Sequence, residues 1–229
     1  MNKLILWDID GTLIYSGGVA GEAMRAAMQR VYGSVWAEAR HSYAGKTDQQ
    51  IILETFADRE HDDLLALLDD FTATYIEELG RRHDEFLTRG RVLDGVAAAL
   101  DRLAAEDVVQ SVLTGNLQPI ARIKLDMMGL ASYLDLDAGA YGSDHHRRAD
   151  LVPIAAARAE RRYGRPFVGA DIVVIGDTPH DIDCGRAAGA RTIAVATGPF
   201  NADDLRAHGA DVVLASLIDT DMVLDLVLR

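Results

Sequence analysis

Two aspartates separated by one residue, Asp8 and Asp10, directly follow the apolar run of residues 4–7. Carboxylates held this close repel each other unless a cation or a shared proton compensates their charge. We expect Mg²⁺ here, because it prefers oxygen ligands and usually binds one or two carboxylates together with phosphate oxygens. Asp177 follows another apolar run, residues 172–175. We therefore expect a third carboxylate beside the first two.

Each of these acids, taken alone, has a simpler explanation. Asp8 or Asp10 could form a turn, and Asp177 could cap a helix that begins at Pro179. Three acids at the ends of strands in one sheet are less easily explained in this way. Their coincidence favours a shared catalytic or metal site.

The residues Thr114-Gly115-Asn116 also follow an apolar run, here residues 108–113. A threonine hydroxyl and free backbone N–H groups at such a turn can hold a phosphate oxygen. Capping of the next helix by Thr114 or Asn116 would explain the same residues equally well. Pro119 suits the first turn of that helix.

Short apolar runs alternate with amphipathic segments along most of the chain. Runs typical of buried strands occupy residues 4–7, 108–113, 134–140, 172–175, 192–195 and 212–214. Segments of helical period occupy residues 96–105, 119–128, 151–163, 179–188 and 202–208. This alternation predicts an α/β fold with a doubly wound parallel sheet and a Rossmann-like core. Such sheets bind ligands beyond the carboxyl ends of their strands, where the acids lie.

Residues 15–88 interrupt this alternation. Their periodic segments, at 19–31, 48–57 and 63–79, all have helical spacing. We therefore expect two units: an α/β core formed by residues 1–14 and 89–229, and an inserted helical cap formed by residues 15–88.

Three segments match the motifs of a known family. Residues 6–13, 111–116 and 175–181 resemble, in this order, the first, second and fourth motifs of the haloacid dehalogenase-like (HAD) hydrolase superfamily. The helical insertion is similar to the cap of its phosphoglycolate phosphatase-like members. The resemblance covers most of the chain, and the order and spacing of the motifs make it specific.

The resemblance implies a role for each acid. Asp8 would attack phosphorus as the nucleophile, while Asp10 would protonate the leaving oxygen and then activate water. Mg²⁺ would be the cofactor, bound by the Asp8 carboxylate, the Asp10 backbone carbonyl and Asp177, with Asp181 holding its waters. Phosphate binding would fall to Thr114, Gly115 and Asn116.

The third motif departs from the family pattern. It usually supplies a lysine before a helix, but residues 144–151 contain none. Arg148 is the best replacement, since arginine keeps the charge and can bind two phosphate oxygens. Arg147, Lys124 and a cap residue are alternatives, although we expect Lys124 on the exposed face of its helix. The two histidines of this segment are expected to be solvated rather than metal ligands.

Residues 45–47 resemble the specificity loop of such caps. Lys46 is accordingly predicted to meet an anionic part of the substrate, although a surface lysine in a turn would look the same. Tyr15 and Ser16, next to the first motif, could line the same pocket.

The composition limits the classes of partner. The chain has 229 residues and a net charge of −13, which argues against a broad positive face for nucleic acid or anionic membrane. Its single cysteine, Cys184, cannot form an internal disulfide, and this favours a reducing compartment. We see neither a signal peptide nor an apolar run of about 18 residues. A cytoplasmic protein is expected.

The sequence thus predicts a Mg²⁺-dependent phosphatase that hydrolyses a small phosphorylated metabolite through an aspartyl-phosphate. A phosphosugar mutase of the β-phosphoglucomutase type is an alternative, because it has the same aspartates, core and cap. A non-catalytic phospho-acceptor module is another, although such modules lack a long helical insertion. Neither the substrate nor the oligomeric state follows from the sequence.

Overall fold

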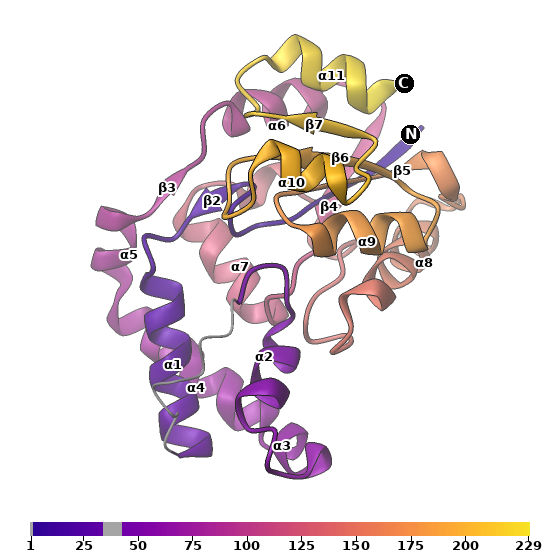
Figure 1. Cartoon of the computed structure of the whole chain (residues 1–229). Coiled ribbons are helices and arrows are strands. Elements are labelled where there is room, and N and C mark those ends of the chain that lie inside the picture. The colour runs from indigo at the N-terminus through magenta and orange to yellow at the C-terminus, as the bar shows by residue number, and fades with distance from the viewer. Residues whose placement is uncertain (1, 34–42) are drawn as a thin grey trace.

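The computed structural model describes residues 2–33 and 43–229 (Figure 1). Its centre is a parallel sheet of five strands in the order β4-β1-β5-β6-β7. The strands are β1 (Lys3–Trp7), β4 (Val108–Val112), β5 (Ile172–Gly176), β6 (Arg191–Val195) and β7 (Val212–Leu214). The chain moves from β1 to β4 on one side and then to β5 on the other. Ligands of open parallel sheets bind at such a change of direction.

Strand β1 is buried on both faces. Leu4 and Leu6 belong to one hydrophobic cluster and Ile5 and Trp7 to another, because successive side chains of a strand point to opposite faces. The first cluster includes residues of α8 (Leu151–Tyr163) and α9 (Pro179–Ala187). The second includes residues of α6 (Val96–Ala104), α7 (Gln118–Met127) and α11 (Thr220–Leu228). Helices therefore cover both faces, and the predicted doubly wound sheet is confirmed.

Between β2 (Ile14–Tyr15) and β3 (Arg91–Val92), the described chain is helical. It forms α1 (Val19–Tyr32), α2 (Asp48–Thr55), α3 (His61–Ala66), α4 (Leu68–Arg81) and α5 (His83–Arg89). These helices lie together below the sheet in Figure 1. The strands β2 and β3 pair as an antiparallel ribbon where the chain leaves and re-enters the sheet region. The exact cap boundaries, residues 15–88, stay a prediction.

The predicted strand at residues 134–140 is wrong. This segment forms turns that run along the edge of β4, with one isolated bridge to the sheet. The Asp135 N–H donates to the Gln110 carbonyl at 2.8 Å, but the Asp135 side chain then accepts the Asp137 N–H at 3.1 Å. An aspartate that binds its own backbone two residues on forms a turn rather than a strand.

One predicted helix is divided in the structure. The expected helix at residues 63–79 is two helices, α3 and α4, which meet at Leu67. No glycine or proline marks this break in the sequence. The longest helices, α1 and α4, have 14 residues each. Across residues 2–33 and 43–229, no helix combines the length and apolar character needed to cross a bilayer.

The helix α10 (Ala202–Ala207) completes the chain order between β6 and β7. Its N-terminus is capped by Asn201, whose side chain accepts the backbone N–H groups of Asp203 and Asp204.

The sequence pattern did not predict helices α5 and α11 or the β2–β3 ribbon. Each is at most nine residues long, and short elements carry too few periods to stand out.

Candidate active site

The carboxyl ends of β1, β4 and β5 lie level with one another. Trp7 pairs in register with both Val112 and Ile175. The chain therefore leaves these strands at the same edge of the sheet. The Asp8 N–H continues the pairing by donating to the Ile175 carbonyl at 2.9 Å. Asp8 and Asp177 consequently reach the same place, as the strand ends predict.

Three carboxylates meet at this edge. Asp8, Asp177 and Asp181 each offer an oxygen within 4.8 Å of the others, and all three are buried. The Thr12 hydroxyl donates to Asp177 Oδ1 at 3.2 Å and helps to orient it. The backbone of Gly198 passes so close that a Cβ atom there would lie 1.7 Å from Asp177 Oδ2. Any larger residue at that position would displace the Asp177 carboxylate.

The shared burial makes charge on these acids costly. Burial is the main cause that raises the pKa of Asp8 to about 7, with Asp181 adding to the rise and Arg148 opposing it. Burial, then Asp8 and Asp181, raise the pKa of Asp177 to about 9. Carboxylates with raised pKa values lack sufficient positive charge around them. The site therefore favours any cation that can bind there.

The balance of charges is consistent with a divalent cation. The carboxylates at this edge are Asp8, Asp10, Asp177 and Asp181, and the cationic side chains that contact them are Arg148 and Lys124. Two negative charges are left without a partner when all four acids are ionised. The donors are all oxygens, which suits a hard cation such as Mg²⁺.

Arg148 lies among the buried carboxylates, just before α8. Its side chain is only 5% exposed, and Nη2 donates to Asp8 Oδ1 at 2.7 Å and to Asp181 Oδ1 at 2.5 Å. Burial alone would lower the pKa of Arg148, but Asp181 and Asp8 raise it well above its ordinary value. Arg147 instead lies at the surface and pairs with Asp150 at 2.7 Å. Of the two arginines, only Arg148 contacts the buried carboxylates, Asp8 and Asp181.

Asp181 also stabilises the start of α9. Its Oδ2 accepts the Thr178 N–H at 3.0 Å and the Thr178 hydroxyl at 2.7 Å, while Thr178 Oγ1 accepts the Asp181 N–H at 3.4 Å. This arrangement is a capping box. The N-cap of α9 is Thr178, so the alternative explanation of Asp177 as a helix cap is wrong.

Asp10 is held by two side chains that follow β4. Its Oδ2 accepts from Asn116 Nδ2 at 2.8 Å and from Lys124 Nζ at 2.7 Å. Lys124 also donates to Asn116 Oδ1 at 2.5 Å, which closes a triangle of contacts. Only 3% of the Lys124 side chain is exposed. The expectation that Lys124 lies on the exposed face of its helix is therefore wrong.

The sequence did contain a signal for Lys124. The buried residues of α7 are Ile120, Ala121, Lys124 and Leu125. This spacing defines one helix face, so the lysine lies inside an apolar stripe. A buried lysine requires a partner for its charge, and the acids of the first motif were the nearest candidates.

The Thr114-Gly115-Asn116 turn is held by its own side chains. Thr114 Oγ1 accepts from the backbone N–H of Asn116 at 3.2 Å and from its Nδ2 at 2.9 Å. The N-cap of α7 is Leu117, and the side chains that accept N–H groups at this helix start are those of Asp48 and Ser143. The alternative explanation of Thr114 or Asn116 as a helix cap is therefore wrong. A Cβ atom at Gly115 would lie 2.0 Å from the Lys46 carbonyl oxygen, so the helical insertion contacts this turn closely.

The start of α2 is fastened to the core. The Thr47 hydroxyl donates to the His146 carbonyl at 2.6 Å, and the Asp48 N–H donates to the Gly115 carbonyl at 2.7 Å. Asp48 Oδ2 accepts the Leu117 N–H at 2.8 Å. Burial is the main cause that raises the pKa of Asp48 to about 6. These bonds hold the insertion over the acids.

Lys46 reaches the site, but its charge is already paired. Lys46 Nζ lies 2.5 Å from Glu54 Oε2, and both side chains are largely shielded from solvent. This pair could not be predicted from the sequence, because a lysine and a glutamate eight residues apart are not neighbours on one helix. Lys46 remains beside the predicted pocket, now as half of an ion pair.

The two adjacent histidines lie outside the acid cluster. The rings of His145 and His146 stack with their centroids 4.6 Å apart, and His145 Nδ1 lies 3.0 Å from Asp150 Oδ2. Among the described residues, the one group with the spacing of metal ligands contains neither histidine. We assign them no metal.

A cavity of about 540 Å³ connects the acids with the helical insertion. On the core side it is lined by Asp8, Asp10, Asn116, Lys124, Arg148 and Asp177. On the other side it is lined by residues of α1, α2, α4 and the β2–β3 ribbon, and Tyr15, Ser16 and Lys46 are among them, as predicted. The cavity is large enough for a small organic ligand.

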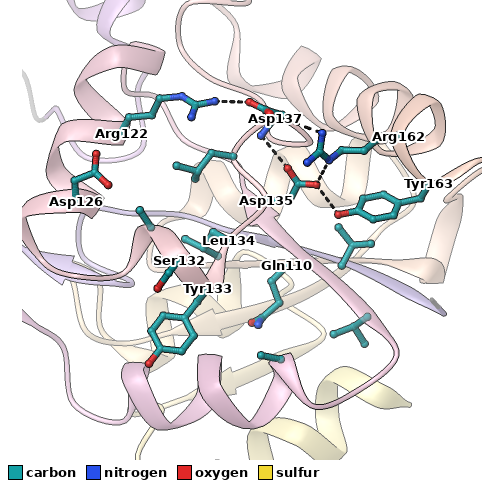
Figure 2. A pocket seen from close by; sticks show the side chains of 15 residues that line it. Gln110, Arg122, Asp126, Ser132, Tyr133, Leu134, Asp135, Asp137, Arg162 and Tyr163 are labelled. Carbon is teal, nitrogen blue, oxygen red and sulfur yellow. Dashed lines mark hydrogen bonds and ion pairs between the residues drawn. The ribbon is translucent and has the colours of Figure 1, made fainter.

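A second, larger hollow of about 740 Å³ lies along the edge of β4 (Figure 2). It shares no lining residue with the first cavity. Four of its five charged side chains pair locally, Arg122 with Asp137 at 2.6 Å and Arg162 with Asp135, and the fifth, Asp126, is exposed. The Tyr163 hydroxyl also donates to Asp135 at 2.5 Å. We call this hollow the β4 groove.

Fold and site together define an α/β enzyme that holds its ligand between the edge of a parallel sheet and a helical insertion. The chain belongs to the haloacid dehalogenase-like hydrolase family, whose sequence profile matches residues 5–186. The predicted family and the prediction of a hydrolase are therefore confirmed.

Relatives and solved structures agree with this assignment. A phosphoglycolate phosphatase of Xanthomonas campestris pv. campestris is 25% identical over 214 residues, which cover 93% of this chain and 91% of that protein. The crystal structure of a predicted phosphatase from Clostridium acetobutylicum aligns with a TM-score of 0.73 at 18% identity, over 98% of this chain and 99% of that one. A hydrolase from Pseudomonas syringae aligns with a TM-score of 0.70 at 19% identity, over 99% of both chains. These two structures share the fold.

Proposed function

We propose that the protein is a Mg²⁺-dependent phosphomonoester hydrolase that acts on a small phosphorylated metabolite through an aspartyl-phosphate on Asp8. The observation that carries the proposal is the meeting of Asp8, Asp177 and Arg148 at the floor of the cavity, with Asp181 directly behind them in contact with Arg148. An excess of carboxylates beside a buried arginine suits a metal together with a phosphoryl group. The phosphatases among its relatives support the same class of reaction.

In the first step, an oxygen of Asp8 bonds to phosphorus while the bond from phosphorus to the leaving oxygen breaks. Asp10 gives its proton to that oxygen, so that an alcohol departs rather than an alkoxide. Asp10 lines the cavity, and 39% of its side chain is exposed. It is therefore accessible to the leaving group.

In the second step, the ionised Asp10 takes a proton from a water molecule. The water oxygen bonds to phosphorus while the bond between phosphorus and Asp8 breaks. Inorganic phosphate leaves, Asp8 is restored as a carboxylate, and Asp10 again carries its proton. A carboxylate nucleophile thus divides one difficult displacement into two easier ones.

The remaining core residues bind and orient. Arg148, which contacts Asp8, would neutralise the phosphoryl oxygens, and the Thr114-Gly115-Asn116 turn would bind them through the Thr114 hydroxyl and the Gly115 N–H, because its other two backbone N–H groups are bonded within the fold. Mg²⁺ bound to the Asp8 carboxylate, the Asp10 carbonyl and Asp177, with Asp181 beyond its waters, would compensate the negative charge of nucleophile and phosphate. Residues 15–88 would form the cap that excludes bulk water.

Lys124 and Asn116 would position the acid. Both donate to Oδ2 of Asp10, so Oδ1 is left for proton transfer. Proton transfer requires a fixed approach of acid to leaving oxygen. We therefore assign Lys124 a positioning role that the family motifs do not describe.

The proposal is tested with a panel of phosphorylated metabolites assayed with Mg²⁺ and with EDTA. We expect release of inorganic phosphate that depends on the metal and is lost in Asp8→Asn. A sugar 1-phosphate that yields its isomer instead of phosphate would support the mutase. A long-lived phosphoprotein without turnover would support a phospho-acceptor module, and turnover by Asp8→Asn would overturn the mechanism.

The cytoplasmic location also remains a proposal. It rests on composition: the chain has one cysteine, Cys184, which cannot form an internal disulfide, and this favours a reducing compartment. Fractionation of cells that produce the native protein would test it.

A further inference from the structure

The cavity extends well beyond the position of a phosphoryl group. Its wall on α1 is formed by Ala20, Gly21 and Met24, and Ile51 of α2 lies on the same wall. Ala20 and Gly21 are small and leave room for a ligand, and Met24 and Ile51 supply apolar surface. Tyr75 of α4 also lines the cavity, but its hydroxyl already donates to the Ala20 carbonyl at 3.1 Å. This part of the wall offers contact area rather than hydrogen bonds.

The cationic side chains at the cavity wall are already engaged. Lys46 pairs with Glu54, and Arg148 and Lys124 bind the catalytic aspartates. The fourth described cation of the lining, Arg91, lies over an aromatic ring. A second anionic group that binds at Lys46, Lys124 or Arg148 would have to break an ion pair, which costs part of its binding free energy. Arg91 is exposed and keeps its N–H groups for a ligand at the Tyr15 end of the cavity.

The rim of the cavity carries an aromatic surface. Tyr15 on β2 lies directly opposite Arg91 on β3, and the Arg91 guanidinium carbon is 4.7 Å from the Tyr15 ring centroid. Cross-strand pairs of this kind hold both side chains in place. Tyr15 nevertheless remains 47% exposed. Rings bind well against such a stacked pair, because aromatic faces and guanidinium planes both accept stacking.

We propose that the enzyme selects phosphomonoesters whose leaving alcohol carries an aromatic ring or a comparable apolar group. The phosphoryl group lies at Asp8, the apolar part lies against Met24 and Ile51, and the ring reaches the Tyr15–Arg91 pair. Small acids such as phosphoglycolate and polyhydroxylated sugar phosphates are poorer substrates, since this wall leaves their polar groups without partners. The inference rests on the proposed phosphatase function and specifies its substrate class.

The test compares four esters that all release a primary alcohol, so that leaving-group chemistry is constant. The esters are 2-phenylethyl phosphate, ethyl phosphate, phosphoglycolate and ribose 5-phosphate, each assayed with Mg²⁺. We expect kcat/KM for 2-phenylethyl phosphate to exceed that for ethyl phosphate by about tenfold to a hundredfold, as burial of a ring provides. Phosphoglycolate and ribose 5-phosphate are expected to lie near or below ethyl phosphate.

Variants locate this preference in the cavity. Tyr15→Ala removes an exposed ring without opening the core, and Met24→Gln keeps the side-chain length while adding polarity. Both should lower the kcat/KM ratio of 2-phenylethyl phosphate to ethyl phosphate. The control Met222→Gln changes an exposed methionine of α11, outside the cavity, and should leave the ratio unchanged. Melting temperatures identify any variant that has lost its fold. If the change at the buried Met24 unfolds the protein, the change at the exposed Tyr15 still tests the proposal.

The Lys46–Glu54 pair supplies a reverse test. Glu54→Gln removes the negative partner of Lys46 and should raise kcat/KM for phosphoglycolate by several fold, while the ratio of 2-phenylethyl to ethyl phosphate stays high. If phosphoglycolate or ribose 5-phosphate equals 2-phenylethyl phosphate in the unmodified enzyme, the substrate class is wrong although the phosphatase function stands. Absence of turnover with all four esters and with an activated aryl phosphate would overturn the proposed function and this inference together.

Discussion

The two hollows of the molecule differ in how they treat charge. The β4 groove is the larger, and it holds arginines and aspartates in pairs at its surface (Figure 2). The cavity is smaller, yet at the sheet edge beneath it Asp8, Asp10, Asp177 and Asp181 are contacted by only two cations, Arg148 and Lys124, and three of the four acids are buried. Paired surface charges contribute little and need no ligand. Buried acids in excess are costly until a ligand compensates them.

This difference separates a functional site from a surface feature better than volume does. Both hollows are lined by aspartate, arginine and tyrosine side chains. Only in the cavity do the raised pKa values of Asp8 and Asp177 record an unmet need for positive charge. Substitutions of the same type in the two hollows should therefore have very different consequences.

The largest expected effect is that of Asp8→Asn. Loss of the nucleophile should lower kcat/KM by about 10⁴-fold or more, because no other group can form the covalent intermediate. Steady-state assays with Mg²⁺ measure this, with Asp137→Asn in the β4 groove as the matched control. A similar loss in both variants would erase the distinction between the hollows.

Lys124→Met should give the next largest effect. With ethyl phosphate we expect kcat/KM to fall by about 10²-fold, because Asp10 loses a contact that positions it for proton donation. With p-nitrophenyl phosphate the fall should be much smaller, since nitrophenolate leaves without a proton. The quantity kcat/KM is chosen because it reports only the steps up to release of the alcohol.

The control for Lys124 is Arg122→Met on the same helix, which removes a cation of the β4 groove. It should leave kcat/KM nearly unchanged with both ethyl phosphate and p-nitrophenyl phosphate. Equal losses with the two esters in Lys124→Met would show that the lysine acts on phosphoryl binding rather than through Asp10.

Stability should depend on pH through the cavity acids. Folding raises the pKa of Asp177 to about 9 and of Asp8 to about 7. At a pH above the ordinary carboxylate pKa and below these raised values, the metal-free folded chain therefore binds more protons than the unfolded chain. Stability in EDTA should therefore fall as the pH rises from about 5 to about 8. Mg²⁺ binds the ionised acids, so it should raise the melting temperature more at the higher pH.

Asp177→Asn should flatten this pH dependence and weaken the response to Mg²⁺. Thermal melts at the two pH values, with EDTA and with Mg²⁺, measure both effects. A melting temperature in EDTA that rises over this range would contradict the assigned burial of the acids.

The smallest effect is expected in the β4 groove. Asp137 is 63% exposed, and its pair with Arg122 is of the surface type. Asp137→Asn should change the free energy of unfolding by less than about 1 kcal/mol and leave kcat/KM within about twofold. Chemical denaturation together with the phosphatase assay checks this. A larger loss of activity would give the groove a function that its paired charges do not suggest.

Much of the site followed from the position of residues at strand ends. Asp8 and Asp177 could be placed together because parallel strands end at one edge, and the register of β1 with β5 bears this out. Arg148 could be chosen over Arg147 only by its spacing to the next helix. Its burial between Asp8 and Asp181 depends on how α8 and α9 pack, which no local pattern encodes.

The errors arose where the partner of one polar or charged side chain decides the structure. Residues 134–140 have the composition of a strand, but Asp135 binds its own backbone and turns the chain. Lys124 was assigned to the surface because lysine usually lies there, although its position in the apolar stripe of α7 argued otherwise. The pairing of Lys46 with Glu54 required the fold of the insertion itself.

The most direct test of the central claim is to trap the phosphorylated enzyme. Asp10→Asn should still accept a phosphoryl group from an aryl phosphate with Mg²⁺ but should lack the base that activates water. Acid quenching and peptide mass spectrometry should then find one phosphoryl group on Asp8, and none in Asp8→Asn. A label on another residue, or rapid release of phosphate by Asp8→Asn with no label, would contradict the account.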